Sequence, residues 1–361
     1  MIKEGKFGVQ EAVCLASIAI SSKIFFSSPG YLTRFVGAAG WYMTIISCVT
    51  AIIAFKLIMM LFKQFPGKNI IDIFELTLGR GTGFFFSISF VAFFLYSDGI
   101  LIREFIGVTK TFILTDTPLS VLAVLFVAVV MVVAVLGLES IARVAKFFAY
   151  TLLFFFVFVI LLCVQNYQVT NLFPVGGYGI DKTLIHGLKR CSAYDEVMIL
   201  TVFAGSLQGT KYLKKAGCIS LFISGAIISI GLFCFSLAFP VQVLQELTSP
   251  MFTMARSISY GAFLQRLDPI FVFMWTISTL ITGAIFFYSS VSCYCKIFRI
   301  RDTKPVILPM GILLFLIVMM PKSLLSVISG GVQTLRGYGW VVLFVLPIIC
   351  LFVNAFKKET S

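Results

Sequence analysis

Ten long apolar stretches run through this chain and restrict the folds open to it. An α-helix needs about 20 apolar residues to cross the hydrocarbon core of a bilayer. Of the 361 residues, 60% are hydrophobic and only 12% are charged, whereas a soluble domain has about 25% charged residues. The sequence predicts an all-α integral membrane protein, a single transmembrane domain over 1–361, with helices at about 8–32, 37–62, 83–113, 118–136, 144–165, 186–208, 217–239, 269–297, 305–321 and 338–356.

The basic residues predict how these helices are oriented. The net charge of +13 falls in short clusters between apolar stretches, not in a basic stripe with spaced aromatic residues that nucleic-acid binding would need. If the N-terminus is cytoplasmic, the tightest clusters, at 211–215 and 296–304, share its side. Because cytoplasmic loops are enriched in Lys and Arg, ten helices with both termini in the cytoplasm fit best.

Two predicted helices carry ionisable residues well inside the apolar stretch. Lys23 follows two serines in the first helix, and Asp195 and Glu196 lie in the sixth. Such groups cost roughly 2.5–3.5 kcal/mol each at bilayer depth and usually face a cavity or a partner. We interpret both places as helix interruptions that line a cavity. The alternatives are an intact first helix with a snorkelling Lys23, and an Asp195 that marks a helix end at the headgroups.

The third and eighth helices leave two further alternatives open. Asp98, Arg103 and Glu104 in the third helix form either a cavity-side polar row or the outer end of a tilted helix. The hydroxyl-rich face of the eighth helix, which includes Thr282, either lines a cavity or bonds its own backbone. The first and sixth helices each open a set of five, which predicts two inverted repeats, about 1–165 and 180–358, with a ligand site at mid-membrane.

The sequence offers little for an enzyme or a cofactor. Nine cysteines are scattered through apolar segments, an odd number that does not indicate a disulfide framework. With one histidine, His186, we expect no metal site. The glycine-rich segment 171–179 lacks the spacing of a phosphate-binding loop. We therefore expect a protein that is not an enzyme and needs no cofactor.

Several short segments, in their order and spacing, resemble the B subunit of bacterial spore germinant receptors. This family belongs to the amino acid–polyamine–organocation transporter superfamily, so the resemblance implies a LeuT-like fold. The match runs over nearly the whole chain. The segments are KQFPGKNI at 63–70, REFI at 103–106, TDTP at 115–118, GLESIAR at 137–143, NLFPV at 171–175, EV at 196–197 and FLQRLDP at 263–269.

The resemblance implies a membrane subunit of the spore inner membrane that senses a small nutrient, often an amino acid, with an A subunit and a lipoprotein C subunit as partners. By position, its ligand-binding candidates are Ser22, Lys23, Ile24, Ala193, Tyr194, Glu196 and Thr282. The family commonly has a glycine-rich run where this chain has Ser22, Lys23 and Ile24. The lysine there would replace a coupling cation, bind a carboxylate or pair with Glu196. The alternative function is a secondary amino acid transporter coupled to protons or cations.

Overall fold

The computed structural model describes residues 5, 7–207, 209–260, 264–265 and 267–359, and these are almost entirely helical. Within these described residues, six helical segments are long and apolar enough to cross a membrane, and two shorter apolar helices accompany them. The chain is therefore a membrane protein. Its α-helices are α1 Val9–Ser21, α2 Ser28–Val36, α3 Gly40–Gln64, α4 Ile70–Phe112, α5 Leu119–Val135, α6 Gly137–Leu162, α7 Ile180–Lys189, α8 Ile199–Val202, α9 Thr210–Ala238, α10 Val241–Leu244, α11 Pro250–Ser257, α12 Asp268–Ile297, α13 Lys304–Met319, α14 Leu324–Ser326, α15 Gln333–Trp340 and α16 Leu346–Glu359.

Short 3₁₀ and π segments connect several of these helices. The 3₁₀ segments are η1 Ser22–Phe25, η2 Gly37–Ala39, η3 Cys163–Asn166, η4 Val169–Leu172, η5 Arg190–Met198 and η6 Ala204–Ser206. The last helical region contains two π segments, η7 Val327–Val332 and η8 Val341–Val345. One short antiparallel hairpin, β1 Ser259–Tyr260 with β2 Leu264–Gln265, precedes α12.

The predicted interruption of the first helix is confirmed, and its cause is local. Ser21 Oγ donates a hydrogen bond to the carbonyl of Ser17, 2.5 Å away, and Ser22 Oγ donates to Ala19 O at 3.1 Å. Hydroxyls bonded back to the preceding turn tend to bend a helix. The backbone tightens into η1, becomes extended at Phe26, and resumes as α2 with Pro29 in its first turn. Lys23 lies in η1 and is buried, so it does not snorkel.

The second predicted interruption is also present. α7 ends at Lys189, and the next nine residues form the 3₁₀ segment η5 before α8 begins at Ile199. A 3₁₀ run this long is unusual and often marks a hinge or a site under strain. Asp195 and Glu196 both lie in η5 and are buried, so Asp195 does not mark a helix end at the headgroups.

The last helical region begins at Leu324 and not near 338, so the predicted boundary is wrong and the region includes Arg336. Apolar residues at helical spacing over 249–266 indicate a surface helix, but the segment is helical only over α11, whose residues are mostly buried. The hairpin follows, and residues 261–263 and 266 lie outside the described part. Residues 70–78, which precede the third predicted helix, form the first part of α4, which bends at Gly79, where φ is 78° and ψ is 177°.

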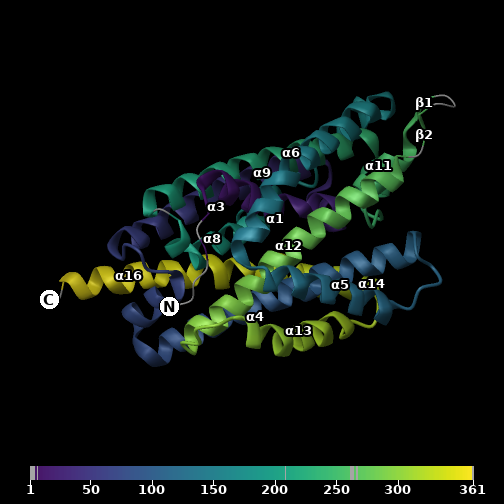
Figure 1. Cartoon of the computed structure of the whole chain (residues 1–361). Helices are drawn as coiled ribbons and strands as arrows, with labels where there is room; N and C mark the ends of the chain where they lie inside the picture. Colours follow the sequence, from purple (N-terminus) through teal and green to yellow (C-terminus); the bar gives the residue numbers. More distant parts are fainter. Residues whose placement is uncertain (1–4, 6, 208, 261–263, 266, 360–361) are drawn as a thin grey trace.

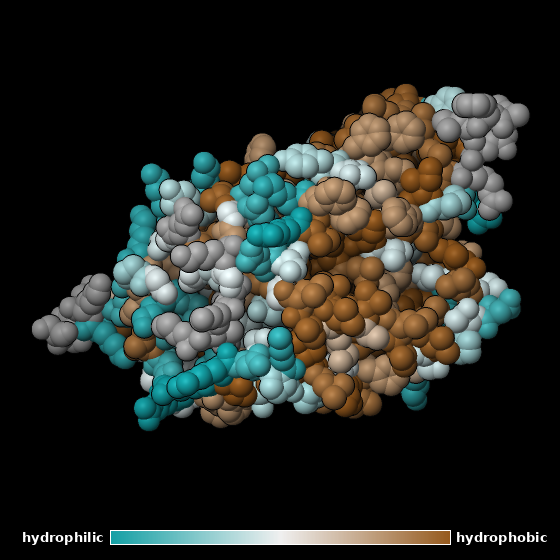
Figure 2. Space-filling model, viewed as in Figure 1, coloured by the Kyte–Doolittle hydropathy of each residue, from teal (hydrophilic) through white to brown (hydrophobic). Residues whose placement is uncertain are grey.

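The interrupted helices lie inside the bundle. α1 packs against α6 and α9, η5 packs against α3 and α15, and α12 packs along α4. Figure 1 shows the long helices running roughly parallel, with both chain ends marked at one end of the molecule and the hairpin at the other. Figure 2 shows a broad apolar area that runs from the middle of this face toward the end with the hairpin, with hydrophilic residues gathered mainly at the opposite end and a few at the hairpin end. This is the surface expected of a protein embedded in a bilayer.

Candidate functional site

A small cavity lies where the two interruptions meet. Its walls come from α1 and η1, α4, η5, α12 and the last helical region. Its volume is about 40 Å³, which is enough for about three waters. The lining residues are Ala19, Ser22, Lys23, Phe26, Ser28, Phe93, Ser97, Ile100, Leu101, Glu104, Glu196, Thr282, Phe286, Val332, Leu335 and Arg336.

Two buried side chains, Lys23 and Glu196, and the largely buried Arg336 form one network at this cavity. Lys23 Nζ lies 2.6 Å from Glu196 Oε2, and Arg336 Nη1 lies 3.0 Å from Glu196 Oε1. Each carboxylate oxygen therefore accepts from a different cation. Buried ions persist when they are paired and hydrogen-bonded, and the triad leaves one positive charge in excess. Glu104 also lines the cavity, so its four ionisable side chains are two cations and two carboxyl groups.

The unwound backbone of η5 completes the network. Lys23 Nζ also donates to the carbonyl of Ala193, and Arg336 Nη1 donates to the carbonyl of Ser192 at 3.1 Å. In return, Ser192 Oγ donates to the carbonyl of Arg336. Carbonyls that a regular helix would use internally thus hold the two cations. η5 and α15 are joined by side-chain and backbone contacts in both directions.

The structure brings most of the sequence-predicted residues together. Ser22, Lys23, Glu196 and Thr282 line the cavity. Thr282 Oγ1 donates to Ser278 O in its own helix, 2.8 Å away, so this hydroxyl both lines the cavity and bonds its backbone.

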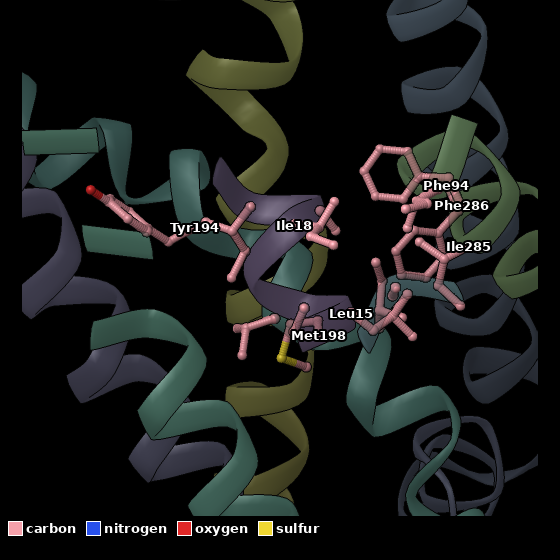
Figure 3. Close-up of a cluster of buried hydrophobic side chains, with 14 of the residues drawn as sticks. Leu15, Ile18, Phe94, Tyr194, Met198, Ile285 and Phe286 are labelled. Carbon is pink, nitrogen blue, oxygen red and sulfur yellow. The ribbon is translucent and has the colours of Figure 1, made fainter. Parts of the chain in front are cut away.

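The remaining three candidates lie beside the cavity. Ile24 and Ala193 line an adjoining hollow of about 30 Å³ that Lys23 and Arg336 also border. Tyr194 is fully buried, and its hydroxyl donates to Thr44 O in α3 at 3.1 Å. Figure 3 shows its ring directed away from Phe94 and Phe286. The bond from Tyr194 to Thr44 positions η5 against α3.

A cluster of apolar side chains lies beside the cavity. Leu15 and Ile18 precede the bend in α1, and Met198 follows Glu196. Figure 3 shows these side chains in one cluster with Phe94 of α4 and Phe286 of α12. All five are buried. Phe286 also lines the cavity, so this cluster packs directly against it.

The polar residues of α4 divide into different environments. Glu104 lines the cavity and accepts hydrogen bonds from the backbone N–H of Ser27, at 2.9 Å, and from its hydroxyl, which anchors the start of α2. Arg103 Nη2 donates to the carbonyl of Pro321, 3.0 Å away, before the last helical region. Asp98 is buried, and neither of its oxygens has a hydrogen-bond partner among the described residues.

Arg336 and Glu104 were missed as site residues by sequence reasoning. The sequence did contain a signal for Glu104. Its place among the ionisable residues of the third predicted helix is compatible with a polar row that faces a cavity, one of the two alternatives given above. Arg336 follows the polar and glycine-containing stretch 329–334, which placed the expected start of the last helix after it. Its partner Glu196 is 140 residues away, so no local pattern could reveal the pair.

Comparisons with known proteins support a family assignment. A family model described as "Spore germination protein" matches residues 10–327. Spore germination protein KB of Bacillus subtilis (strain 168) is 23% identical over 330 residues, which cover 90% of this chain and 88% of that protein. Spore germination protein B2 of the same organism is 24% identical over 331 residues, covering 89% and 88%.

Solved structures show the same fold at low identity. A nucleobase-cation-symport-1 family transporter in a closed conformation, with bromovinylhydantoin bound, has a TM-score of 0.69 and 13% identity, covering 100% of this chain and 94% of that one. A Na⁺-coupled sialic acid symporter in a substrate-bound outward-open state has a TM-score of 0.68 and 16% identity, covering 95% and 79%. This chain therefore has the LeuT-like fold of these transporters.

Proposed function

This chain belongs to the spore germination protein family, and from that premise we propose that it is the nutrient-sensing membrane subunit of a spore germinant receptor. Its ligand is a small amino-acid-type nutrient that binds at mid-membrane between the first, third, sixth and eighth helices. The ligand-binding residues in this proposal are Ser22, Lys23, Ile24, Ala193, Tyr194, Glu196 and Thr282, together with Arg336.

The observation that carries the proposal is the triad of Lys23, Glu196 and Arg336 at a cavity between two helix interruptions. Lys23 and Arg336 share one carboxylate, Glu196, and both cations line the cavity, so they can also contact the carboxylate of a ligand. Arg336 Nε is buried and has no partner in the described part of the chain, so this cation has a donor to spare. Glu104 and the carbonyls of η5 are acceptors suited to an ammonium group.

Binding requires the cavity walls to move. About 40 Å³ holds about three waters, fewer atoms than any amino acid contains. A ligand that fits only an expanded cavity shifts the equilibrium toward that conformation by its difference in affinity for the two states. The subunit passes this shift to its partners, an A subunit and a lipoprotein C subunit. The germination proteins KB and B2 among its relatives support a receptor of this kind.

In this proposal the chain crosses the spore inner membrane ten times as two inverted repeats of five helices, with both termini in the cytoplasm. Both chain ends lie at the same end of the molecule (Figure 1), which supports an even number of crossings. The contact between Lys357 Nζ and the carbonyl of Thr77, 2.8 Å away, also places the end of α16 beside the basic region that follows α3.

The second candidate is a secondary amino acid transporter, which the fold of the solved relatives favours. Uptake of a labelled amino acid into vesicles that contain only this chain distinguishes the sensing proposal from the transporter. The sensing proposal predicts no net uptake above that of empty vesicles. Accumulation driven by a proton or cation gradient would favour the transporter.

Nutrient-triggered germination of spores tests the site itself. We expect Lys23→Met and Glu196→Gln each to abolish or strongly weaken the response to single nutrients, because each removes one member of the triad. Lys56→Met in α3 and Glu246→Gln after α10 change the same chemical groups at exposed positions and serve as controls. If both site variants germinate like the parent strain while both are present in the membrane, the ligand binds elsewhere.

A further inference from the structure

A second and larger cavity lies behind the bend in the first helix. It has a volume of about 180 Å³ and lies among α1, η1, α6 and α9, with Ser278 of α12 at its edge. Its walls are mostly apolar and include Val13, Ile18, Ile24, Leu152, Phe156 and Ile227. Nothing in the proposed nutrient site uses this space.

The two cavities lie on opposite faces of the same helical segment. Ala19, Ser22, Lys23 and Phe26 line the nutrient cavity, and their spacing of three and four residues places them on one face. Cys14, Ser17, Ile18, Ser21 and Phe25 line the second cavity and recur with the same spacing on the other face. The bend is therefore the wall between a charged cavity and an apolar one.

The second cavity opens toward lipid. Tyr150 and Leu153 of α6 line it, and their side chains are 61% and 42% exposed. Their neighbours Phe147 and Phe154 are 73% and 69% exposed on the same apolar helix. Large apolar side chains exposed on a membrane-crossing helix face hydrocarbon. The medium at the mouth of this cavity is therefore the acyl chains of the bilayer.

Water is a poor occupant for this space. An ordered water needs two to four polar partners, and apolar cavities of this size stay dry and bind hydrocarbons, as an engineered cavity of about 150 Å³ does with benzene. Gln10 Nε2 is already bonded to Tyr150 Oη at 2.7 Å, and Ser21 Oγ is bonded to Ser17 O. Among the lining residues that the structure describes, Ser17 Oγ is the buried side-chain oxygen without a partner.

We propose that this cavity binds one acyl chain of a membrane phospholipid, which enters between Tyr150 and Leu153 and packs behind the bend. The chain contacts Ile18, Ile24 and Phe25, whose neighbours Lys23 and Phe26 face the nutrient cavity. An acyl chain in this position supports the bent conformation of the first helix. A movement of α1 toward α6 would have to expel it. This coupling rests on the proposed function, whereas acyl-chain binding does not.

Photo-crosslinking in liposomes tests the binding. The full chain is reconstituted in phosphatidylglycerol and phosphatidylcholine that contain a phospholipid with a diazirine in its acyl chain, and crosslinked residues are located by mass spectrometry. We expect crosslinks at the cavity-lining residues within 13–25 and 149–156. Their yield should exceed the crosslinking yield at exposed apolar residues of α5, which measures ordinary contact with bilayer lipid. A yield no higher than on α5 would overturn the proposal.

A cavity-filling variant makes the test specific. Ala149→Phe places a ring in the cavity and should reduce the cavity crosslinks several-fold, whereas Val157→Phe, on the same helix but outside the cavity, should leave them unchanged. Ser17→Leu fills the cavity from α1 and replaces Ala149→Phe if that variant does not fold. Undiminished crosslinks in a folded filling variant would refute acyl-chain binding. Because the readout needs no nutrient, it is independent of the nutrient site.

Discussion

Neutralising Glu196 and removing Lys23 have opposite effects on the charge buried at the bend. Glu196 accepts from Lys23 at 2.6 Å and from Arg336 at 3.0 Å, and the triad carries one net positive charge. Glu196→Gln leaves Lys23 and Arg336 without the carboxylate that both contact. Lys23→Met leaves a neutral pair of Glu196 and Arg336 and keeps an unbranched side chain of similar length. The two substitutions should therefore differ in stability although both disable the site.

The size of the difference follows from the burial of the triad. Removing the carboxylate that pairs both cations costs about 3–5 kcal/mol. Lys23→Met loses the ion pair with Glu196 and the hydrogen bond to Ala193 O, but Glu196 stays paired with Arg336, and losing hydrogen bonds of a charged group in this way costs about 1.5–3 kcal/mol. With an unfolding entropy of about 2.1 cal/mol/K per residue, the unfolding midpoint should fall by about 4–7 °C for Glu196→Gln and by about 2–4 °C for Lys23→Met.

Thermal unfolding of the purified protein in one detergent, at one scan rate, measures this difference. Glu246→Gln provides the control for the chemical change at an exposed carboxylate. The double variant Lys23→Met/Glu196→Gln leaves one unpaired cation instead of two and should be more stable than Glu196→Gln alone. If Lys23→Met lowers the midpoint as much as Glu196→Gln does, the charge balance inferred from the triad is wrong.

Three further predictions concern the last helix, the bend in α4 and the topology. Gly339→Ala should destabilise the protein by about 1–3 kcal/mol, because a Cβ there would lie 2.5 Å from Asp195 Oδ2, whereas Gly337→Ala has nothing within 4 Å and should be tolerated in the same unfolding assay. Gly79→Ala should destabilise the protein by about 1–3 kcal/mol, because the backbone of Gly79 has a conformation that essentially only glycine adopts. Gly81→Ala, at a helical position, should not lower the unfolding midpoint. Equal midpoints for the two variants would contradict the backbone strain inferred at position 79. A reporter fused after Ser361 should be cytoplasmic, and an external signal would mean an odd number of crossings.

The interruptions were predictable because they are local. A lysine after two serines and adjacent carboxylates at 195–196 stand out inside apolar stretches, and the cost of burying charge makes a cavity the expected reason. The structure places Lys23 and Glu196 in contact across 173 residues. The symmetric positions of the two interruptions suggested this proximity, although no local pattern fixed the contact.

The last helix was not predictable in the same way. Its first part contains Ser329, Gly330, Gly331 and Gln333, which lower the apolar content below that of a membrane-crossing stretch. The helix widens into η7 there and packs against η5 and α4: Gly331 is buried beside Ile100 of α4, whereas Ser329 and Gly330 are exposed. Arg336 is stabilised there by Glu196. Contacts with residues far away in the sequence therefore determine where the last helix begins. Such contacts also determine the different surroundings of Asp98, Arg103 and Glu104.

The most direct test of the nutrient site is a structure of the chain, with its receptor partners, determined in the presence of the nutrient that triggers germination. We predict density for the nutrient between η1 and η5, with its carboxylate within hydrogen-bond distance of Lys23 or Arg336 and the contacts of Glu196 rearranged. Density at another place in the receptor, with the triad unchanged from its present geometry, would contradict the account.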